Sequence, residues 1–225
     1  MKKKILLIIG YVVISLILIL PSIEASILND FTSFTGMNNI ELGMEFTDFK
    51  VMYPNVNGFG NDSKAICMLE FSETEDTWNN GTFLFKDGKL KHISLARLKL
   101  KNVVDTEQYF NIDQKVIPII DKLTKKIGKF ITIKVNKKED DLTHYEPVII
   151  WKHKNITVSL SYTPQKQIKK VLIPHISLAI MSEDESHSSY FHELHELPYD
   201  QVSLDDLLSE GIKKSLYGSS EVIIK

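Results

Sequence analysis

The stretch that decides the fold is Thr82-Phe83-Leu84-Phe85-Lys86-Asp87-Gly88-Lys89-Leu90-Lys91-His92-Ile93-Ser94-Leu95-Ala96. Two strand-like runs flank Asp87-Gly88. An Asp-Gly pair in that position is the strongest short-range hairpin signal, because a type I′ turn needs two residues that tolerate positive φ. The sequence therefore predicts an antiparallel hairpin here, and Cys67 to Phe71 is predicted to supply a neighbouring strand.

A short helix is expected before this hairpin. Thr47 can cap a helix of about two turns from Asp48 to Tyr53, with the Asp48 carboxylate favourable in its first turn. Pro54 and the Asn/Gly-rich run 55–62 then end the helix, and we interpret that run as a turn.

After Asp105 the apolar period becomes helical and predicts a long amphipathic helix that lies over one sheet face. Gly128 closes it, and Pro118 either kinks it or marks its true first turn. The apolar face consists of Ile112, Val116, Ile119, Leu123 and Ile127.

Four further strands are predicted beyond Gly128, over residues 130–135, 147–151, 156–162 and 171–181. Residues 152–155 are predicted to form a hairpin tip between the second and third of them. Pro174 makes part of the last run an edge or a bulge. Helices combined with runs of hairpins predict an α+β fold with mostly antiparallel sheet. The sections 40–100 and 105–182 are candidate structural repeats, in one sheet or in two.

The N-terminus has the layout of a secretory signal. Lys2 to Lys4 form a basic region, Ile5 to Leu20 is almost wholly apolar, and small residues surround Ala25. We predict a signal peptide over residues 1–25, cleaved after Ala25, and an exported domain over 26–182. An uncleaved membrane anchor is the alternative, although the run is slightly short for a spanning helix.

Composition narrows the class of protein. The formal net charge is −2, and Cys67 is the chain's one cysteine. Without a disulfide the exported domain must be held by packing, and we interpret Cys67 as a buried apolar residue. A Cys-poor, Lys- and Ile-rich exported chain suits a bacterial envelope, periplasmic or secreted, better than a eukaryotic extracellular space. The chain lacks the basic stripe that nucleic acid requires, and we expect membrane contact only through an uncleaved leader.

Residues 183–225 form an acidic, His/Glu-rich linker followed by a helix. His187, His192 and His195 are candidate metal ligands, because imidazoles three apart share a helix face. A solvated polar linker is the alternative interpretation. His192-Glu193-Leu194-His195 is one residue shorter than the zincin pattern His-Glu-x-x-His, so no catalytic zinc motif is present.

Ser203 can cap a C-terminal helix from Leu204 to Leu216, with acidic residues in its first turn and lysines in its last. Its apolar stripe must dock on the body, on a second copy or on another protein. We predict a partner-binding role for the residues of this stripe: Leu204, Leu207, Leu208, Ile212 and Leu216.

Two motifs carry a resemblance over about residues 40–97. Ile40-Glu41-Leu42-Gly43-Met44-Glu45-Phe46-Thr47-Asp48-Phe49 and the hairpin Phe85-Lys86-Asp87-Gly88-Lys89-Leu90 resemble segments of the SmpA/BamE-like outer-membrane assembly lipoprotein domains. The resemblance implies a non-enzymatic envelope module. The chain departs from that pattern in three ways: no lipidated cysteine follows the leader, the second helix before the strands is missing, and a further long section follows.

No nucleophile setting or phosphate loop is recognisable, and His92, His144, His153 and His175 look scattered. We therefore expect a non-enzymatic module that binds a protein partner in the envelope and needs no cofactor. A small-ligand or lipid carrier, with its pocket under the long helix, is the first alternative. A metal-dependent hydrolase that uses the tail histidines is the second.

Overall fold

The computed structural model describes residues 40–61, 64–70, 78, 80–98, 112–138, 144–168, 174–186, 194–197 and 202–218. Its elements in chain order are α2 (Phe46–Met52), β1 (Asn57–Asn61), β2 (Lys64–Glu70), β3 (Asn80–Lys86), β4 (Lys89–Leu98), α4 (Ile112–Ile127), β5 (Thr132–Lys138), β6 (His144–His153), β7 (Ile156–Tyr162), α5 (Gln165–Ile168), β8 (His175–Ser182), α6 (Glu183–Ser186), β9 (His195–Glu196), α8 (Leu204–Leu207) and α9 (Glu210–Tyr217). The predicted signal peptide lies outside these residues. None of the helices described is both long and apolar enough to cross a bilayer.

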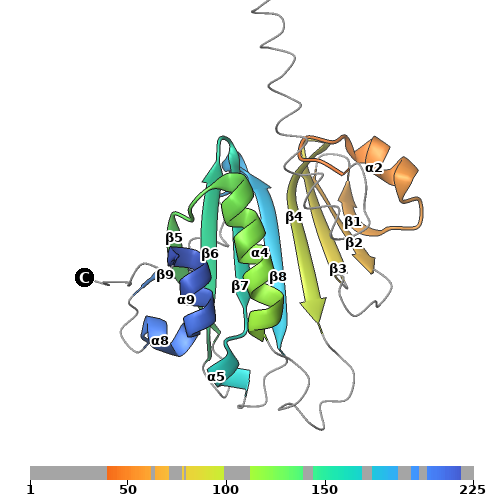
Figure 1. Cartoon of the computed structure of the whole chain (residues 1–225). Coiled ribbons are helices and arrows are strands. Elements are labelled where there is room, and N and C mark those ends of the chain that lie inside the picture. Colours follow the sequence, from red (N-terminus) through yellow and green to blue (C-terminus); the bar gives the residue numbers. More distant parts are fainter. Residues whose placement is uncertain are drawn as a thin grey trace, which may run out of the picture.

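All of these strands form one antiparallel sheet, in the order β1-β2-β3-β4-β8-β7-β6-β5-β9. The predicted α+β class with mostly antiparallel sheet is therefore confirmed. The two sections of the sequence share this sheet, because β4 pairs with β8. In each section a helix is followed by four strands that are neighbours in the sheet, α2 by β1–β4 and α4 by β5–β8, with α5 between β7 and β8 in the chain (Figure 1).

The predicted hairpin is present as β3 and β4. Asp87 and Gly88 both have positive φ, 53° and 72°, as a type I′ turn requires. The second predicted tip, between β6 and β7, is also present, with Lys154 at a φ of 51°. Local turn chemistry thus places both hairpins correctly.

The two motifs that carry the family resemblance contact each other through their backbones. The Gly43 N–H donates to the Leu90 carbonyl at 2.7 Å, and the Leu90 N–H donates to the Met44 carbonyl at 2.9 Å. The Phe46 N–H donates to the Gly88 carbonyl at 2.7 Å. The β3–β4 turn therefore satisfies a donor that a helix N-terminus otherwise leaves unpaired.

This contact explains why α2 differs from its prediction. The helix begins at Phe46, and Glu45 occupies the N-cap position without a side-chain hydrogen bond. The predicted cap at Thr47 is wrong, because the hairpin backbone already holds the first turn. The run 55–62 was also predicted as a turn only, whereas residues 57–61 of it form strand β1.

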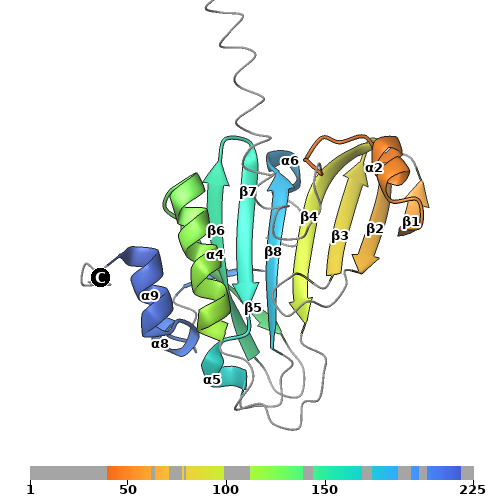
Figure 2. The same ribbon diagram turned by 45° about the vertical axis from the view of Figure 1, so that its right-hand side comes forward.

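One face of the sheet carries the helices and most of the core. We call it the helix-bearing face. It includes one row of buried side chains that the strand register aligns across five strands: Phe83, Ile93, Ile180, Val158 and Trp151. Helix α2 packs its Phe49 ring on Phe83 and Phe85, with ring centroids 5.0 and 5.1 Å apart. Figures 1 and 2 show α2 over the β1–β3 end and α4 over the β6–β8 end.

Helix α4 spans residues 112–127 and has Pro118 inside it, so Pro118 does not mark its first turn. Pro118 is exposed, and the helix continues past it. The buried side of α4 consists of Ile112, Val116, Ile119, Ile120 and Leu123.

A substitution in α2 tests this packing. Phe49 is 0 % exposed, whereas Val51 of the same helix is 81 % exposed. Phe49→Ala should lower the free energy of unfolding by about 3–5 kcal/mol, because a buried ring leaves a cavity. Val51→Ala should change it by less than about 0.5 kcal/mol. Chemical denaturation of both variants checks this, and equal effects would contradict the packing described.

Candidate protein-docking surface

The apolar stripe of the C-terminal segment packs on the body of the same chain. Figures 1 and 2 show α9 beside α4, and a Cβ added to Gly211 would lie 3.1 Å from Ile117 Cδ1. Of the predicted partner-binding residues, Leu204 is partly buried and the others are buried in the same core as α4: Leu207, Leu208, Ile212 and Leu216. The stripe therefore docks on the body of its own chain, one of the three options that the sequence leaves open, and the partner-binding role of these residues stays a prediction.

The C-terminal helix is also two helices rather than one. Ser203 occupies the N-cap of α8, as predicted, and its backbone N–H and its hydroxyl both donate to the Asp206 carboxylate, at 3.2 and 2.7 Å. Leu208 then adopts extended backbone, and the Ser209 hydroxyl accepts from the Ile212 N–H to begin α9. A second capping serine inside the predicted helix is the physical reason for the break.

The acidic side chains of α8 and α9 have basic partners. Lys213 pairs with Asp205 and, at 2.8 Å, with Glu210. These two hydrogen bonds raise the pKa of Lys213. Hydrogen bonds from Ser203 are the main cause of the lowered pKa of Asp206, which also lies 3.5 Å from Lys166 Nζ. Residues 203–217 therefore do not present an unpaired acidic surface to a partner.

Of the three candidate metal ligands, His195 lies within the described residues, on β9, where it is exposed and opposite Val135. His187 and His192 fall outside them. The metal hypothesis for His187, His192 and His195 therefore stays a prediction.

The structure does bring together two histidines that look scattered in the sequence. Glu146 Oε1 lies 3.6 Å from His144 Nε2 and 3.3 Å from His175 Nε2. The Thr163 hydroxyl is 3.0 Å from His175 Nδ1. His144 and Glu146 are two apart on β6 and share a face, a signal present in the sequence. His175 comes from β8 across β7, which no local pattern indicates.

This cluster has the residue types of a nucleophile, a base and a carboxylate, but its nucleophile and its carboxylate are buried. Thr163 and Glu146 are each 1 % exposed. The Thr163 oxygen also accepts the His175 backbone N–H at 3.2 Å. Within the described ranges no group of three His, Cys, Asp or Glu side chains is arranged to hold a metal ion. We interpret the cluster as a buried polar network that joins the ends of β6, β7 and β8.

The exposed apolar surface lies at the opposite margin of the sheet. Phe59 on β1 is 68 % exposed, and Ile66 and Met68 on β2 are 39 % and 44 % exposed. Phe59 is directly opposite Ile66, and Ile66 is opposite Leu84 of β3, which is half-buried. Directly opposite residues share a face. These side chains project from the face opposite the helices, and we call this group of four the edge surface.

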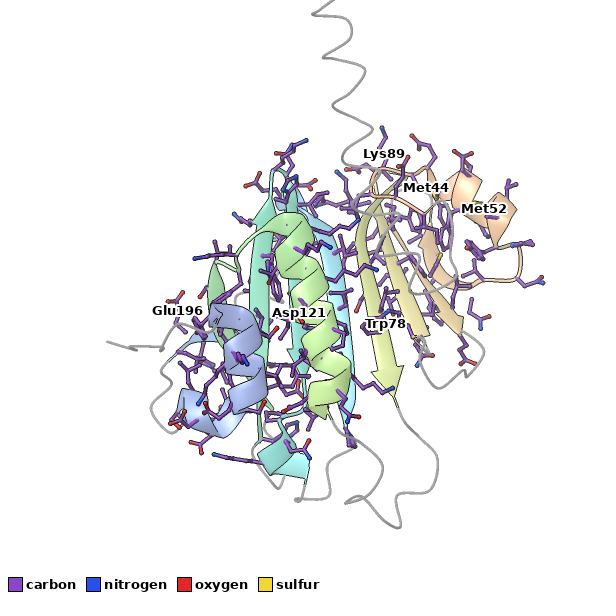
Figure 3. The ribbon with its side chains drawn as sticks, viewed as in Figure 1. Met44, Met52, Trp78, Lys89, Asp121 and Glu196 are labelled. Carbon is purple, nitrogen blue, oxygen red and sulfur yellow. The ribbon has the colours of Figure 1, made fainter. Side chains whose placement is uncertain are left out.

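Strand β1 is the outer strand at this margin. It pairs with β2 on one side, and Figure 2 shows it at the end of the sheet. Exposed apolar residues of α2, Val51 and Met52, lie at the same margin. Figure 3 shows Met52 there, far from Glu196 at the β9 margin. The margin thus combines apolar side chains with a strand that, among the described strands, pairs on one side only.

The glycines of β1 have a local structural reason. A Cβ at Gly58 would lie 3.2 Å from Cys67 Sγ, and a Cβ at Gly60 would lie 2.1 Å from the Lys64 carbonyl oxygen. Close backbone approach to β2 therefore requires glycine at position 60, and a side chain at position 58 would have to displace the Cys67 sulfur. Burial raises the pKa of the Cys67 thiol, which Lys50 opposes, and Cys67 is 0 % exposed. It behaves as a core residue under the strand and not as a reactive thiol.

Comparison with protein-family models, with curated proteins and with solved structures finds no match for this chain. The candidate site is therefore assigned from the geometry and exposure of its own residues.

Substitutions in α9 test the packing of this stripe on the body. Ile212 is 1 % exposed, whereas Lys214 of the same helix is exposed. Ile212→Ala should lower the free energy of unfolding by about 2–4 kcal/mol, because it empties a core position. Lys214→Ala should alter it by no more than about 0.5 kcal/mol. Denaturation midpoints measure both, and a neutral Ile212→Ala would mean that α9 is not part of the core.

Proposed function

We propose that this chain is an exported, non-enzymatic protein of the cell envelope that binds another protein through the edge surface. The observation that carries the proposal is the row of Phe59, Ile66 and Leu84 beside the outer backbone of β1. An extended segment that adds to a sheet edge gains main-chain hydrogen bonds, and neighbouring side chains supply specificity. The edge surface offers both.

The contrast with the rest of the same sheet face supports this choice. Toward the other end, Ala179, Met181, Ser159 and Ile150 are buried on that face. Leu194 packs there on Val148 and Ile150. Apolar side chains of the sheet are thus buried at one end and exposed beside β1. Soluble proteins rarely leave large apolar side chains grouped in water without a binding role.

The side chains under α4 favour protein binding over the carrier alternative. Ile112, Val116 and Leu123 would line the pocket of a carrier, but each is 0 % exposed and belongs to the main core cluster. Packed core side chains take the place that a lipid or small ligand would need.

Photo-crosslinking in the native cell tests the proposal. A photoreactive phenylalanine analogue at position 59 should capture one defined protein, because Phe59 lies on the outer strand and is the most exposed side chain of the edge surface. The matched control is position 131, since Ile131 is also apolar and 57 % exposed but lies beside β5.

Adding Ile66→Ser and Met68→Ser should reduce the captured product at least about tenfold, as expected where a few apolar residues carry most of the binding energy. Equal, diffuse labelling from positions 59 and 131 would contradict the proposal.

A further inference from the structure

We propose that the occupant of the edge surface is a second copy of this chain, with its β1 paired antiparallel to β1 of the first about a two-fold axis at Phe59. This inference rests on the proposed function, because it uses the same surface and names its partner.

The sequence of β1 is self-complementary. Asn57-Gly58-Phe59-Gly60-Asn61 reads the same in both directions. Antiparallel pairing centred on Phe59 therefore sets Asn57 opposite Asn61, Gly58 opposite Gly60, and Phe59 opposite the Phe59 of the second copy. A two-fold interface between identical subunits requires this kind of self-complementary surface.

The register of the sheet extends this match beyond β1. Within one chain, Leu84, Ile66 and Phe59 lie directly opposite one another on three successive strands. Pairing about Phe59 continues that line into Phe59, Ile66 and Leu84 of the second copy. One unbroken row of apolar side chains then crosses six strands, and the Phe59 side chains of the two copies become direct cross-strand neighbours at its centre.

Strand β1 also lacks the features that keep sheet edges apart. Natural edges are commonly protected by lysine, proline or inward-pointing charge, and β1 contains none of these. Like charges directly opposite each other would oppose pairing, and the five residues of β1 supply no charge. On the helix-bearing face, glycine at positions 58 and 60 leaves no side chains that could clash when the two β1 strands pair.

A cysteine at the axis tests the geometry. In a full chain with Cys67→Ala, Phe59→Cys should form a disulfide-linked dimer under mild oxidation. Residues directly opposite each other have Cα atoms about 4.5–5.5 Å apart, within disulfide range.

Asn57→Cys in the same background is the matched control. Two copies of residue 57 would be four residues apart along the strands, about 13 Å, and should not link. A mixture of Asn57→Cys and Asn61→Cys chains should link again. Circular dichroism checks that each variant folds.

Light scattering completes the test. It measures the molar mass of the unmodified full chain over a range of concentrations. The expected result is a dimer that Phe59→Lys converts to a monomer with unchanged circular dichroism. A monomer that shows no link at residue 59, while photo-crosslinking there still captures another protein, overturns the second copy and leaves the proposed function standing. A monomer with neither result overturns both. A dimer that links through 57 and not through 59 overturns the register proposed.

Discussion

The pairing of β4 with β8 is the contact on which the rest of this structure depends. Each half of the chain is a helix followed by consecutive antiparallel strands, and the last strand of one half pairs with the last strand of the other. Because each half ends at this central pair, its first strand is forced outward. Strands β1 and β5 therefore lie far from the centre. The backbone N–H and C=O groups on their outer sides must be paired, covered or otherwise protected.

The two margins of the sheet differ in how their outer strands are covered. At one of them β9 pairs with β5 at Val135 and Lys134, and the α8–α9 segment packs against α4 near that end of the sheet. At the other, β1 ends the sheet beside exposed Phe59, Ile66 and Met68. The C-terminal segment thus completes the half to which it belongs, and no corresponding segment among the described residues covers β1. This asymmetry places the candidate docking surface.

The sequence predicts those parts of the fold that local chemistry determines. Asp87-Gly88 fixes a hairpin because few residue pairs tolerate two positive φ values. Ser203 marks a helix start because serine is favoured at the N-cap position, which it occupies in α8. Strand β1 could not be found in the same way, since glycine and asparagine have low strand propensity and β1 exists through its pairing with β2. The contact of His175 with Glu146 is equally non-local. The apolar stripe of the tail can be recognised from its helical spacing in the sequence. Its docking on α4 cannot, because the two segments are far apart in the chain. The edge surface likewise becomes visible only once the strand order is known.

Hydrogen–deuterium exchange of the full chain, at low and at high protein concentration, tests most directly that β1 accepts another strand. The account predicts that amides of residues 57–61 become more protected as concentration rises, while those of β6 and β7 exchange at the same rates throughout, because their backbone groups are already paired within the sheet. Unchanged exchange across β1 at every concentration would contradict it, since an outer strand that never gains a hydrogen-bonded neighbour is not a docking site for this chain.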